Sequence, residues 1–368
     1  MRFFVLLCLA WAAVTVTFTA PASGNSDPNV SVTGMESIPS LVESIRFSED
    51  IRFCETRIPI EDPQVAADLE RELMLALWNR PQVILWIKRA SQLFPHIEQI
   101  LAEENMPDDL KYVPVIESAL RPHARSFASA VGYWQFLKAT GERYGLRVDT
   151  YVDERRNLFK STRAACHYLK ELFDEFGSFP LALAAYNMGE HGLAVEIDAQ
   201  QTRNYFDLYL PLETQHYLYK LTAAKLILEN PEKYGFHLEP GDLYPDLQLA
   251  RIDLTPEEEV PLMIVAQAAG VTFKTLKIMN PDIRGYYLSS GPSTILVPEG
   301  HEKEFHSRFA DLYTDWQKDS HARIHVVRPG ESLISIARDY DMSLAELLRR
   351  NKIPYNHVIH PGDRLTVK

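Results

Sequence analysis

The chain has 368 residues, a net charge of −12 and 46% hydrophobic residues. This length exceeds what one hydrophobic core usually covers, so we expect two or three domains. The acidic balance argues against nucleic acid as the partner, because a nucleic-acid-binding chain needs a basic surface.

The N-terminus has the order of a signal peptide. Arg2 precedes an apolar run from residue 3 to about residue 20, and the small residues Ala20-Pro21-Ala22 follow. This order predicts a cleaved signal over residues 1–22 and a mature protein in the periplasm or cell envelope. The alternative is an uncleaved N-terminal membrane anchor, because roughly 18 apolar residues can span a bilayer.

Two cysteines, Cys54 and Cys166, remain after the signal. In an oxidising compartment the two thiols could pair. Cys166 occupies an apolar position of a predicted helix, where a free cysteine acts as a small hydrophobic side chain. We favour two free thiols and leave the pairing open.

The chain after the signal divides by composition into several segments. Residues 23–50 are rich in Ser, Asn, Pro and Gly and predict a flexible leader. Residues 51–105 carry apolar side chains at helical spacing, interrupted at Pro81, and predict an all-helical extension. Residues 106–237 begin with a further helix that has Pro107 in its first turn.

Two more helices are expected within residues 106–237. Apolar residues along one face predict a helix from Asn157 to Phe176. The almost wholly apolar stretch from Pro180 to Tyr186 predicts a buried helix that ends at Asn187-Met188-Gly189. Such a helix would hold the side chains of Tyr186 and Asn187 with little freedom, as a binding site requires.

An acidic residue, Glu117, follows an apolar run at residues 112–116 and precedes a loop rich in aromatic and amide side chains. Apolar surroundings disfavour a charged carboxylate and raise its pKa, so the group can donate a proton near neutral pH. Cleavage of a glycosidic bond requires a general acid of this kind.

Five segments in order and spacing carry a family resemblance. They are Glu117-Ser118-Ala119-Leu120, Ser126 to Phe136, Asn157 to Leu169, Ala184-Ala185-Tyr186-Asn187-Met188-Gly189, and Leu210 to Tyr217. Together they resemble the motifs of the family 1 lytic transglycosylases, lysozyme-like enzymes that cut bacterial peptidoglycan. The resemblance covers roughly residues 60–235. It implies a mainly α fold with a lysozyme-like catalytic domain over residues 106–237.

The resemblance also implies roles for single residues. Glu117 would protonate the oxygen between N-acetylmuramic acid and N-acetylglucosamine, and then accept the proton of the C6 hydroxyl, which leaves a 1,6-anhydro end. Tyr186 would donate a hydrogen bond to Glu117 and orient it. The expected substrate contacts are Ser126, Trp134, Gln135, Asn187, Glu213 and Tyr217.

Several of these side chains also have a structural interpretation. Ser126 could cap a turn, and Trp134 and Asn187 could lie in the core. Glu213 and Tyr217 stand four residues apart on one predicted helix and could form a structural pair. Glu213 is also the second carboxylate that a hydrolase would use.

The C-terminal region contains an internal repeat. Val265-Ala266 and Asn280 correspond to Ile336-Ala337 and Asn351, and each copy ends in a short segment of β type. A repeated pattern of this kind indicates two copies of one small structural unit.

The second copy, residues 324–368, opens with Arg328-Pro329-Gly330-Glu331-Ser332 and resembles a LysM module, a small βααβ domain that binds glycans containing N-acetylglucosamine. The first copy, residues 245–298, resembles a degenerate LysM module that lacks this opening. Residues 299–323 between the copies predict a helical linker.

No cofactor or metal is expected, because the histidines lack the spacing of a zinc helix and no Gly-rich phosphate loop is present. The partner implied by the resemblance is the glycan strand of peptidoglycan. We therefore expect a peptidoglycan lytic transglycosylase. The alternatives are a muramidase hydrolase and a peptidoglycan-binding protein without catalysis.

Overall fold

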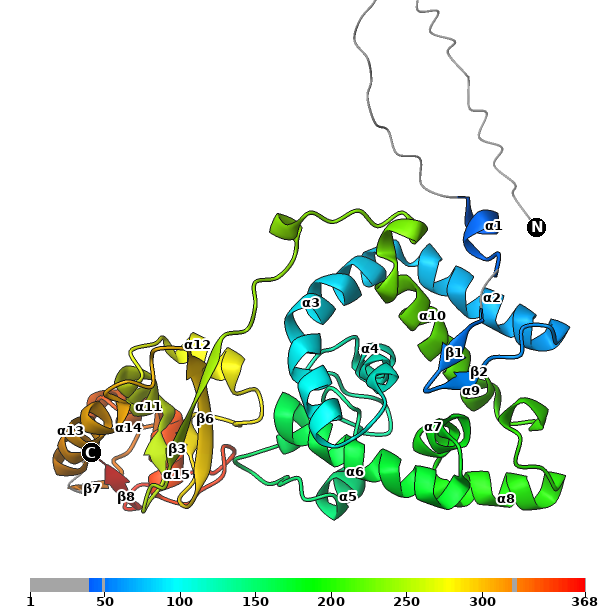
Figure 1. Cartoon of the computed structure of the whole chain (residues 1–368). Coiled ribbons are helices and arrows are strands. Elements are labelled where there is room, and N and C mark those ends of the chain that lie inside the picture. Colours follow the sequence, from blue (N-terminus) through cyan, green and yellow to red (C-terminus); the bar gives the residue numbers. More distant parts are fainter. Residues whose placement is uncertain (1–39, 48–49, 320–322, 368) are drawn as a thin grey trace, which may run out of the picture. The chain divides into compact units, whose positions relative to one another are not determined.

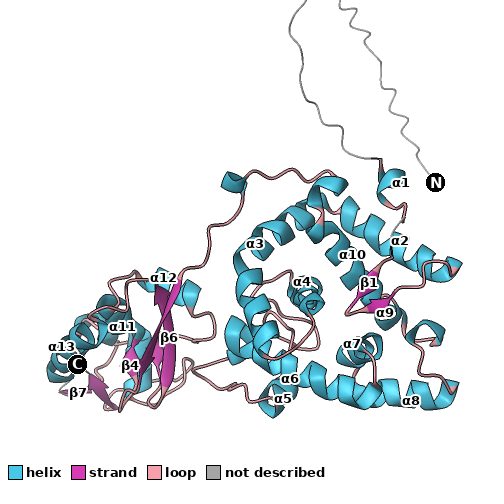
Figure 2. Ribbon diagram, viewed as in Figure 1, coloured by secondary structure: helices cyan, strands magenta, loops and turns pink. Residues whose placement is uncertain are grey.

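The computed structural model describes residues 40–367 except residues 48–49 and 320–322. The predicted signal peptide and most of the predicted leader lie outside the described residues. The described chain is built mainly from helices up to residue 242, and its longer strands come after residue 248 (Figures 1 and 2). The expected class, mainly α followed by small α+β modules, is confirmed.

The first part of the fold is built almost wholly from helices. A short antiparallel pair, β1 (Arg52–Phe53) and β2 (Thr56–Arg57), precedes α2. The α-helices are α1 (Leu41–Ser44), α2 (Pro63–Trp78), α3 (Arg80–Glu103), α4 (Val113–Ser118), α5 (Lys138–Arg143), α6 (Leu158–Phe176), α7 (Phe179–Met188), α8 (Glu190–Gln200), α9 (Leu212–Gln215) and α10 (Tyr217–Glu229). The 3-10 helices are η1 (Asp108–Tyr112), η2 (Glu154–Arg156), η3 (Tyr205–Asp207), η4 (Pro231–Tyr234) and η5 (Pro240–Asp242).

Local chemistry explains where the expected helices begin and end. The side chain of Asn157 caps α6 by accepting the backbone N–H of Lys160, and Gly177 ends the helix at a φ of 80°. The helix α7 ends at Gly189. The interruption expected at Pro81 is confirmed, because this proline lies in the first turn of α3.

The predicted helical extension and the predicted catalytic region share one hydrophobic core. Leu69 of α2 and Ile97 of α3 belong to the same buried cluster as Val113, Leu169 and Leu183. The helix that carries Glu117 therefore packs in a core to which the extension contributes.

Two βααβ units follow the helical part. In the first, β3 (Leu249–Leu254) pairs antiparallel with β6 (Ser293–Pro298), and α11 (Leu262–Ala268) and α12 (Phe273–Met279) lie between them in sequence. A second short pair joins β4 (Val260–Pro261) to β5 (Tyr287–Leu288). In the second unit, β7 (Arg323–Val326) pairs with β8 (Arg364–Val367) around α14 (Leu333–Asp339) and α15 (Leu344–Arg350).

The repeated asparagines have equivalent hydrogen bonds in the two units. The Asn280 amide donates to the Leu276 carbonyl at 2.9 Å and to the Leu296 carbonyl at 2.7 Å, and it accepts the Leu296 N–H at 2.8 Å. Asn351 makes the same three bonds, to Leu347 and to Thr366, at 2.8, 2.9 and 2.6 Å. Each asparagine thus ties the end of the second helix to the last strand.

The helix expected between the units is α13 (Phe305–Asp319). Phe305 is 0% exposed and Phe309 is buried. Both side chains belong to the core of the first unit, and Leu312 packs against it. The helix α13 is therefore part of the first unit's packing.

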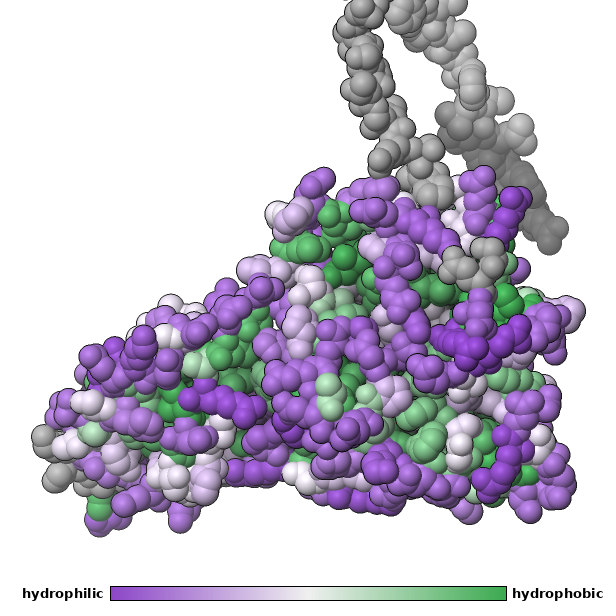
Figure 3. All heavy atoms as spheres, viewed as in Figure 1, coloured by the Kyte–Doolittle hydropathy of each residue, from purple (hydrophilic) through white to green (hydrophobic). Residues whose placement is uncertain are grey.

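The surface shown in Figure 3 is mostly hydrophilic, with hydrophobic residues in patches between. Cys54 and Cys166 are buried free thiols. Among the described residues no single helix is long and apolar enough to cross a membrane, although α11 and α12, bent by 97°, pass that test as a pair.

Candidate active site

Glu117 is the penultimate residue of α4, a short helix with a buried apolar face. Pro114 lies in its first turn, and Val113 and Val115 are buried. The helix ends at Ala119, whose φ of 52° lies in the left-handed region. Glu117 keeps some exposed surface at the point where the helix stops.

Ser118 fixes the end of α4 to the loop that follows. Its buried hydroxyl lies 2.8 Å from the carbonyl oxygen of Tyr133, and it accepts the backbone N–H of Arg121 at 3.2 Å. The side chains of Arg121 and Arg89 donate to the carbonyls of Ser118 and Ala119 at 3.0 and 2.9 Å. Two cations therefore stabilise the negative end of the helix that carries the acid.

The pKa of Glu117 is raised to about 7, and burial is the main cause. The neighbouring charge of Glu213 raises it further, whereas a hydrogen bond from Tyr217 and the charge of Lys220 lower it. The Tyr217 hydroxyl donates to Glu117 Oε1 at 2.5 Å. A carboxyl with this pKa is available in both protonation states near neutral pH, as a group that acts as acid and then as base requires.

The expected hydrogen bond from Tyr186 to Glu117 is wrong. The Tyr186 hydroxyl donates to the Trp134 carbonyl at 2.6 Å. Its ring packs against Tyr168, with the ring centroids 5.3 Å apart, and the charge of Glu117 contributes to the raised pKa of its phenol. Tyr186 thus lies near Glu117 and holds the loop, while Tyr217 is the tyrosine that donates to the Glu117 carboxyl.

Of the two positions left open for Trp134, a substrate contact or a place in the core, the structure shows the core. Trp134 is 0% exposed, and its indole N–H donates to the Thr162 hydroxyl at 3.0 Å. A fully buried, hydrogen-bonded tryptophan is a core residue. Its hydrogen bond to Thr162 holds the loop against α6.

Gln135 and Ser126 both hold the loop in shape. Gln135 is partly exposed, and its amide donates to the carbonyls of Gly132 and Ala124 at 2.8 and 3.2 Å. The exposed Ser126 accepts the backbone N–H of Ala130 at 3.1 Å and so caps a turn. Both side chains retain accessible surface toward solvent.

Close packing fixes the same loop against η2. Gly132 has a φ of 90°, and a Cβ atom at this position would lie 1.8 Å from the carbonyl oxygen of Arg155. The Arg155 guanidinium in turn donates to the carbonyl of Phe136 at 3.1 Å. A glycine is required here, because any side chain would meet backbone.

The remaining candidates lie on α7 and around α9. Asn187 accepts the Thr214 hydroxyl at 2.8 Å, so α7 is joined to α9. Glu213 is exposed and influences Glu117 through its charge. The expectation that one helix carries both Glu213 and Tyr217 is wrong, since α9 ends at Gln215 and α10 begins at Tyr217.

Lys220 is the charged neighbour of Glu117 that sequence reasoning missed. The signal was available, because Lys220 follows Tyr217 by three residues, a spacing that places two side chains on one face of a helix, here α10. Among the described residues no group of three His, Cys, Asp or Glu side chains could hold a metal ion.

Two family models match the chain. The transglycosylase SLT domain matches residues 95–208, which include Glu117 and Tyr186 but end before Tyr217. The LysM domain matches residues 325–368.

Known proteins are similar over a larger part of the chain. It is 34% identical over 280 residues to membrane-bound lytic murein transglycosylase D of Escherichia coli (strain K12), and equally to the protein of that name from Escherichia coli O6:H1 (strain CFT073). These matches cover 72% of this chain and 61% of each relative, so the chain spans less than two thirds of their length. The crystal structure of the 70 kDa soluble lytic transglycosylase of Escherichia coli matches 38% of this chain and 24% of that one, at 16% identity and a TM-score of 0.33.

Proposed function

Because the chain carries a transglycosylase SLT domain and a C-terminal LysM domain, we propose that it is a lytic transglycosylase that cleaves the glycan strands of peptidoglycan in the cell envelope. The observation that carries this proposal is Glu117, a residue that keeps some exposed surface, whose carboxyl has its pKa raised to about 7 by burial and accepts a hydrogen bond from Tyr217. The names of the 34% identical relatives support the same reaction.

In the proposed reaction Glu117 donates its proton to the oxygen that links N-acetylmuramic acid to N-acetylglucosamine, and the bond from that oxygen to C1 of the muramic residue breaks. Tyr217 stabilises the carboxylate that results, because a hydroxyl donor favours the charged form. The C6 hydroxyl of the same residue then forms the new bond to C1 and gives its proton to Glu117. The acid is restored, and the product has a 1,6-anhydro end.

Substrate contacts are proposed for four polar residues that keep accessible surface, namely Ser126, Gln135, Asn187 and Glu213. Of these, Glu213 acts on Glu117 through its charge. The LysM domain would hold the enzyme on glycans that contain N-acetylglucosamine. The N-terminal export signal stays a prediction from the sequence.

The test is Glu117→Gln with mass spectrometry of the muropeptides released from purified sacculi. An amide cannot donate the proton, so release should fall by about 10² to 10⁴ or more while the fold is kept. A folded Glu117→Gln protein that releases anhydro-muropeptides at the wild-type rate would contradict the role of Glu117.

A muramidase hydrolase is the second candidate, because Glu213 lies close enough to raise the pKa of Glu117. A hydrolase would use Glu213 as its second carboxylate and release reducing ends. Glu213→Gln separates the two: the transglycosylase should keep forming anhydro ends, whereas a hydrolase should lose most of its activity. The anhydro or reducing end is read directly from the product mass.

A further inference from the structure

The first βααβ unit is joined to the helical part by hydrogen bonds as well as by the chain. We call residues 149–157, which include η2, the junction loop, and residues 280–284, at the end of α12, the junction turn. Val152 and Ile283 form an antiparallel β-bridge between them. Two backbone hydrogen bonds of 2.8 and 2.6 Å flank this bridge. The contact thus has the hydrogen-bond pattern of a sheet.

Asp282 lies at the centre of this contact. It is 5% exposed, and its Oδ2 atom accepts the Asn157 amide at 3.2 Å. Burial raises the pKa of the Asp282 carboxyl, and its Oδ1 atom has no hydrogen-bond partner among the described residues. Asn157 is also the N-cap of α6, so a residue of the first unit supports the start of that helix.

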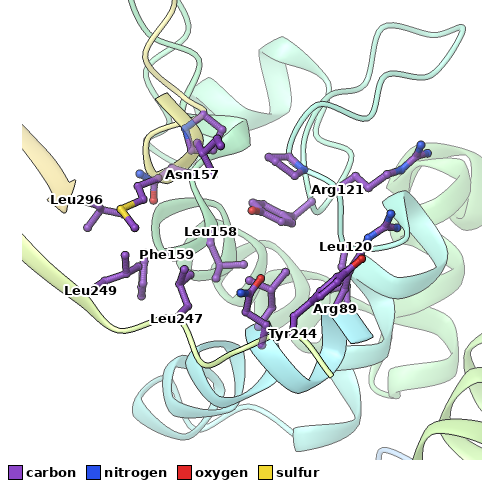
Figure 4. A pocket seen from close by; sticks show the side chains of 17 residues that line it. Arg89, Leu120, Arg121, Asn157, Leu158, Phe159, Tyr244, Leu247, Leu249 and Leu296 are labelled. Carbon is purple, nitrogen blue, oxygen red and sulfur yellow. The ribbon is translucent and has the colours of Figure 1, made fainter. Parts of the chain in front are cut away.

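Apolar side chains surround the same contact. A pocket of about 290 Å³ lies beside it, with walls from both sides (Figure 4). Figure 4 shows Leu158 and Phe159 of α6 together with Leu249 and Leu296 of the first unit. A further side-chain hydrogen bond joins the two parts, because Arg147 donates to the Ser289 hydroxyl at 3.1 Å. Separation of the two parts would expose this apolar lining to water.

The junction loop in turn supports the loop beside the acid. Asp153 is bound on both carboxylate oxygens by Arg155, at 2.8 and 2.9 Å, and both side chains are buried. Arg155 holds the carbonyl of Phe136, and its own carbonyl lies against Gly132. The supported loop then reaches α4 through the hydrogen bond of Ser118 to the Tyr133 carbonyl.

We propose that the junction turn positions Glu117 for catalysis, with Asp282 as the positioning residue, and that the first unit is a fixed part of the catalytic scaffold. The proposal rests on the proposed function only where turnover is measured. The first unit then has a structural role that does not require it to bind glycan itself.

The test is Asp282→Lys in the full chain, which places a cation in the buried junction near Lys277 and Arg156. The matched control is Asp253→Lys, the same charge change at an exposed position of β3 in the same unit. The conservative variant Asp282→Asn keeps the size and an acceptor for the Asn157 amide. Turnover of a soluble glycan fragment and its pH profile are measured for all three.

For Asp282→Lys we expect kcat to fall about ten-fold or more with KM changed less than about two-fold, and the alkaline limb of the pH profile to move. Asp253→Lys and Asp282→Asn should stay within about two-fold of wild type. If Asp282→Lys does not fold, the double variant Arg147→Ala/Arg284→Ala carries the same test. It removes two hydrogen bonds between the parts from exposed side chains, that of Arg147 to Ser289 and that of Arg284 to the Asp149 carbonyl at 2.8 Å. Wild-type kcat and an unmoved pH profile in a folded junction variant would overturn the proposal.

Amide hydrogen exchange at Asp153 and Arg284 gives a readout that does not need turnover. These two N–H groups donate across the junction. Both should be protected in the wild type and exchange faster in Asp282→Lys but not in Asp253→Lys. Rapid exchange of both amides in the wild type would disprove the docked junction whatever reaction the enzyme catalyses. A protected junction without turnover in the wild type would instead remove the proposed function.

Discussion

The pKa of Glu117 results from burial, which raises it, and from neighbours that act in both directions. Tyr217 and Lys220 favour the carboxylate, and Glu213 disfavours it. Each neighbour can be removed without changing Glu117 itself. The pH dependence of activity should therefore respond to each with a sign that can be stated in advance.

Tyr217→Phe removes the hydroxyl that donates to Glu117 and keeps the ring. The hydrogen bond lowers the pKa of Glu117, so its loss should raise that pKa and move the alkaline limb of the activity profile to higher pH. The carboxylate formed after proton transfer also loses a donor, which should lower kcat by roughly ten-fold. A pH–rate profile on soluble glycan fragments measures both effects.

The control is Tyr186→Phe, which removes a hydroxyl bound to the Trp134 carbonyl. Activity can fall here because the loop loses a support, but the alkaline limb should stay in place. An upward shift in Tyr186→Phe and none in Tyr217→Phe would reverse the assignment of the two tyrosines.

Glu213→Gln and Lys220→Gln should shift the same limb in opposite directions. Removal of the negative charge of Glu213 should lower the pKa of Glu117, and removal of the positive charge of Lys220 should raise it. The shift in Glu213→Gln should shrink as salt is added, because this side chain is exposed. Shifts of the same sign in the two variants would contradict the electrostatic account.

The sequence motifs point to Glu117 as the candidate acid, but they could not show which tyrosine reaches it. Tyr186 and Tyr217 both follow motif residues, and both are in electrostatic contact with Glu117. The direction of each hydroxyl depends on how α7 and α10 pack, which composition and spacing do not encode. The burial of Trp134 has the same origin, since its partner Thr162 lies on α6.

The loop beside the acid depends on one glycine. Gly132→Ala should destabilise the fold by about 3 kcal/mol or more, because the new Cβ would meet the Arg155 carbonyl oxygen at a position that also has a φ of 90°. The matched control is Gly145→Ala, where φ is 86° and nothing lies within 4 Å. It should cost only the backbone strain, about 1–2 kcal/mol. Chemical denaturation measures both, and equal losses would show that the contact with Arg155 is not tight.

The two βααβ units can be compared through their shared asparagine. Asn351→Ala removes the acceptor of the Thr366 N–H and a donor to the Thr366 carbonyl, while the Leu347 carbonyl keeps the backbone N–H of residue 351; the local cost is roughly 1–3 kcal/mol. Hydrogen exchange of the Thr366 amide should become faster. Asn280→Ala should do the same to the Leu296 amide and leave Thr366 protected. Protection of Thr366 unchanged in Asn351→Ala would contradict this shared role.

Helices with a continuous apolar face, such as α6 and α7, could be predicted because burial imposes a period on the sequence. The interruption between α9 and α10 could not be predicted from the sequence. No proline or glycine stands near His216. The Tyr205 hydroxyl instead donates to the carbonyls of Thr214 and Gln215 at 3.0 and 2.9 Å, a contact with a separate segment of the chain.

Removal of residues 320–368 tests how the LysM domain contributes to the whole molecule. The cut is placed after α13, because this helix packs into the first unit. The shortened enzyme should keep its turnover of soluble glycan fragments and bind intact sacculi less well, since tethering raises the local concentration of substrate without changing the barrier. Pelleting with sacculi measures binding. Unchanged binding would remove the targeting role of residues 324–368.

The division of the chain into a helical part and two repeated units could be inferred from the change in composition and the spacing of Asn280 and Asn351. The attachment of the first unit to the helical part could not be inferred from the sequence. Asn157 and Asp282 are 125 residues apart in the sequence. Each lies at the end of a helix whose own sequence accounts for it, Asn157 at the start of α6 and Asp282 after α12. Nothing in either segment shows that one faces the other.

The long sequence distance between Asn157 and Asp282 has a consequence for the order in which parts of the protein fold during its synthesis. Contacts between residues distant in sequence form late, because the intervening chain must first be brought together. The junction cannot close until residues 280–284 have emerged from the ribosome. If the junction positions the acid, a nascent chain would hold Glu117 on a formed helix and yet be a poor catalyst. Full cell-wall-cutting activity would then begin only after most of the chain has been delivered.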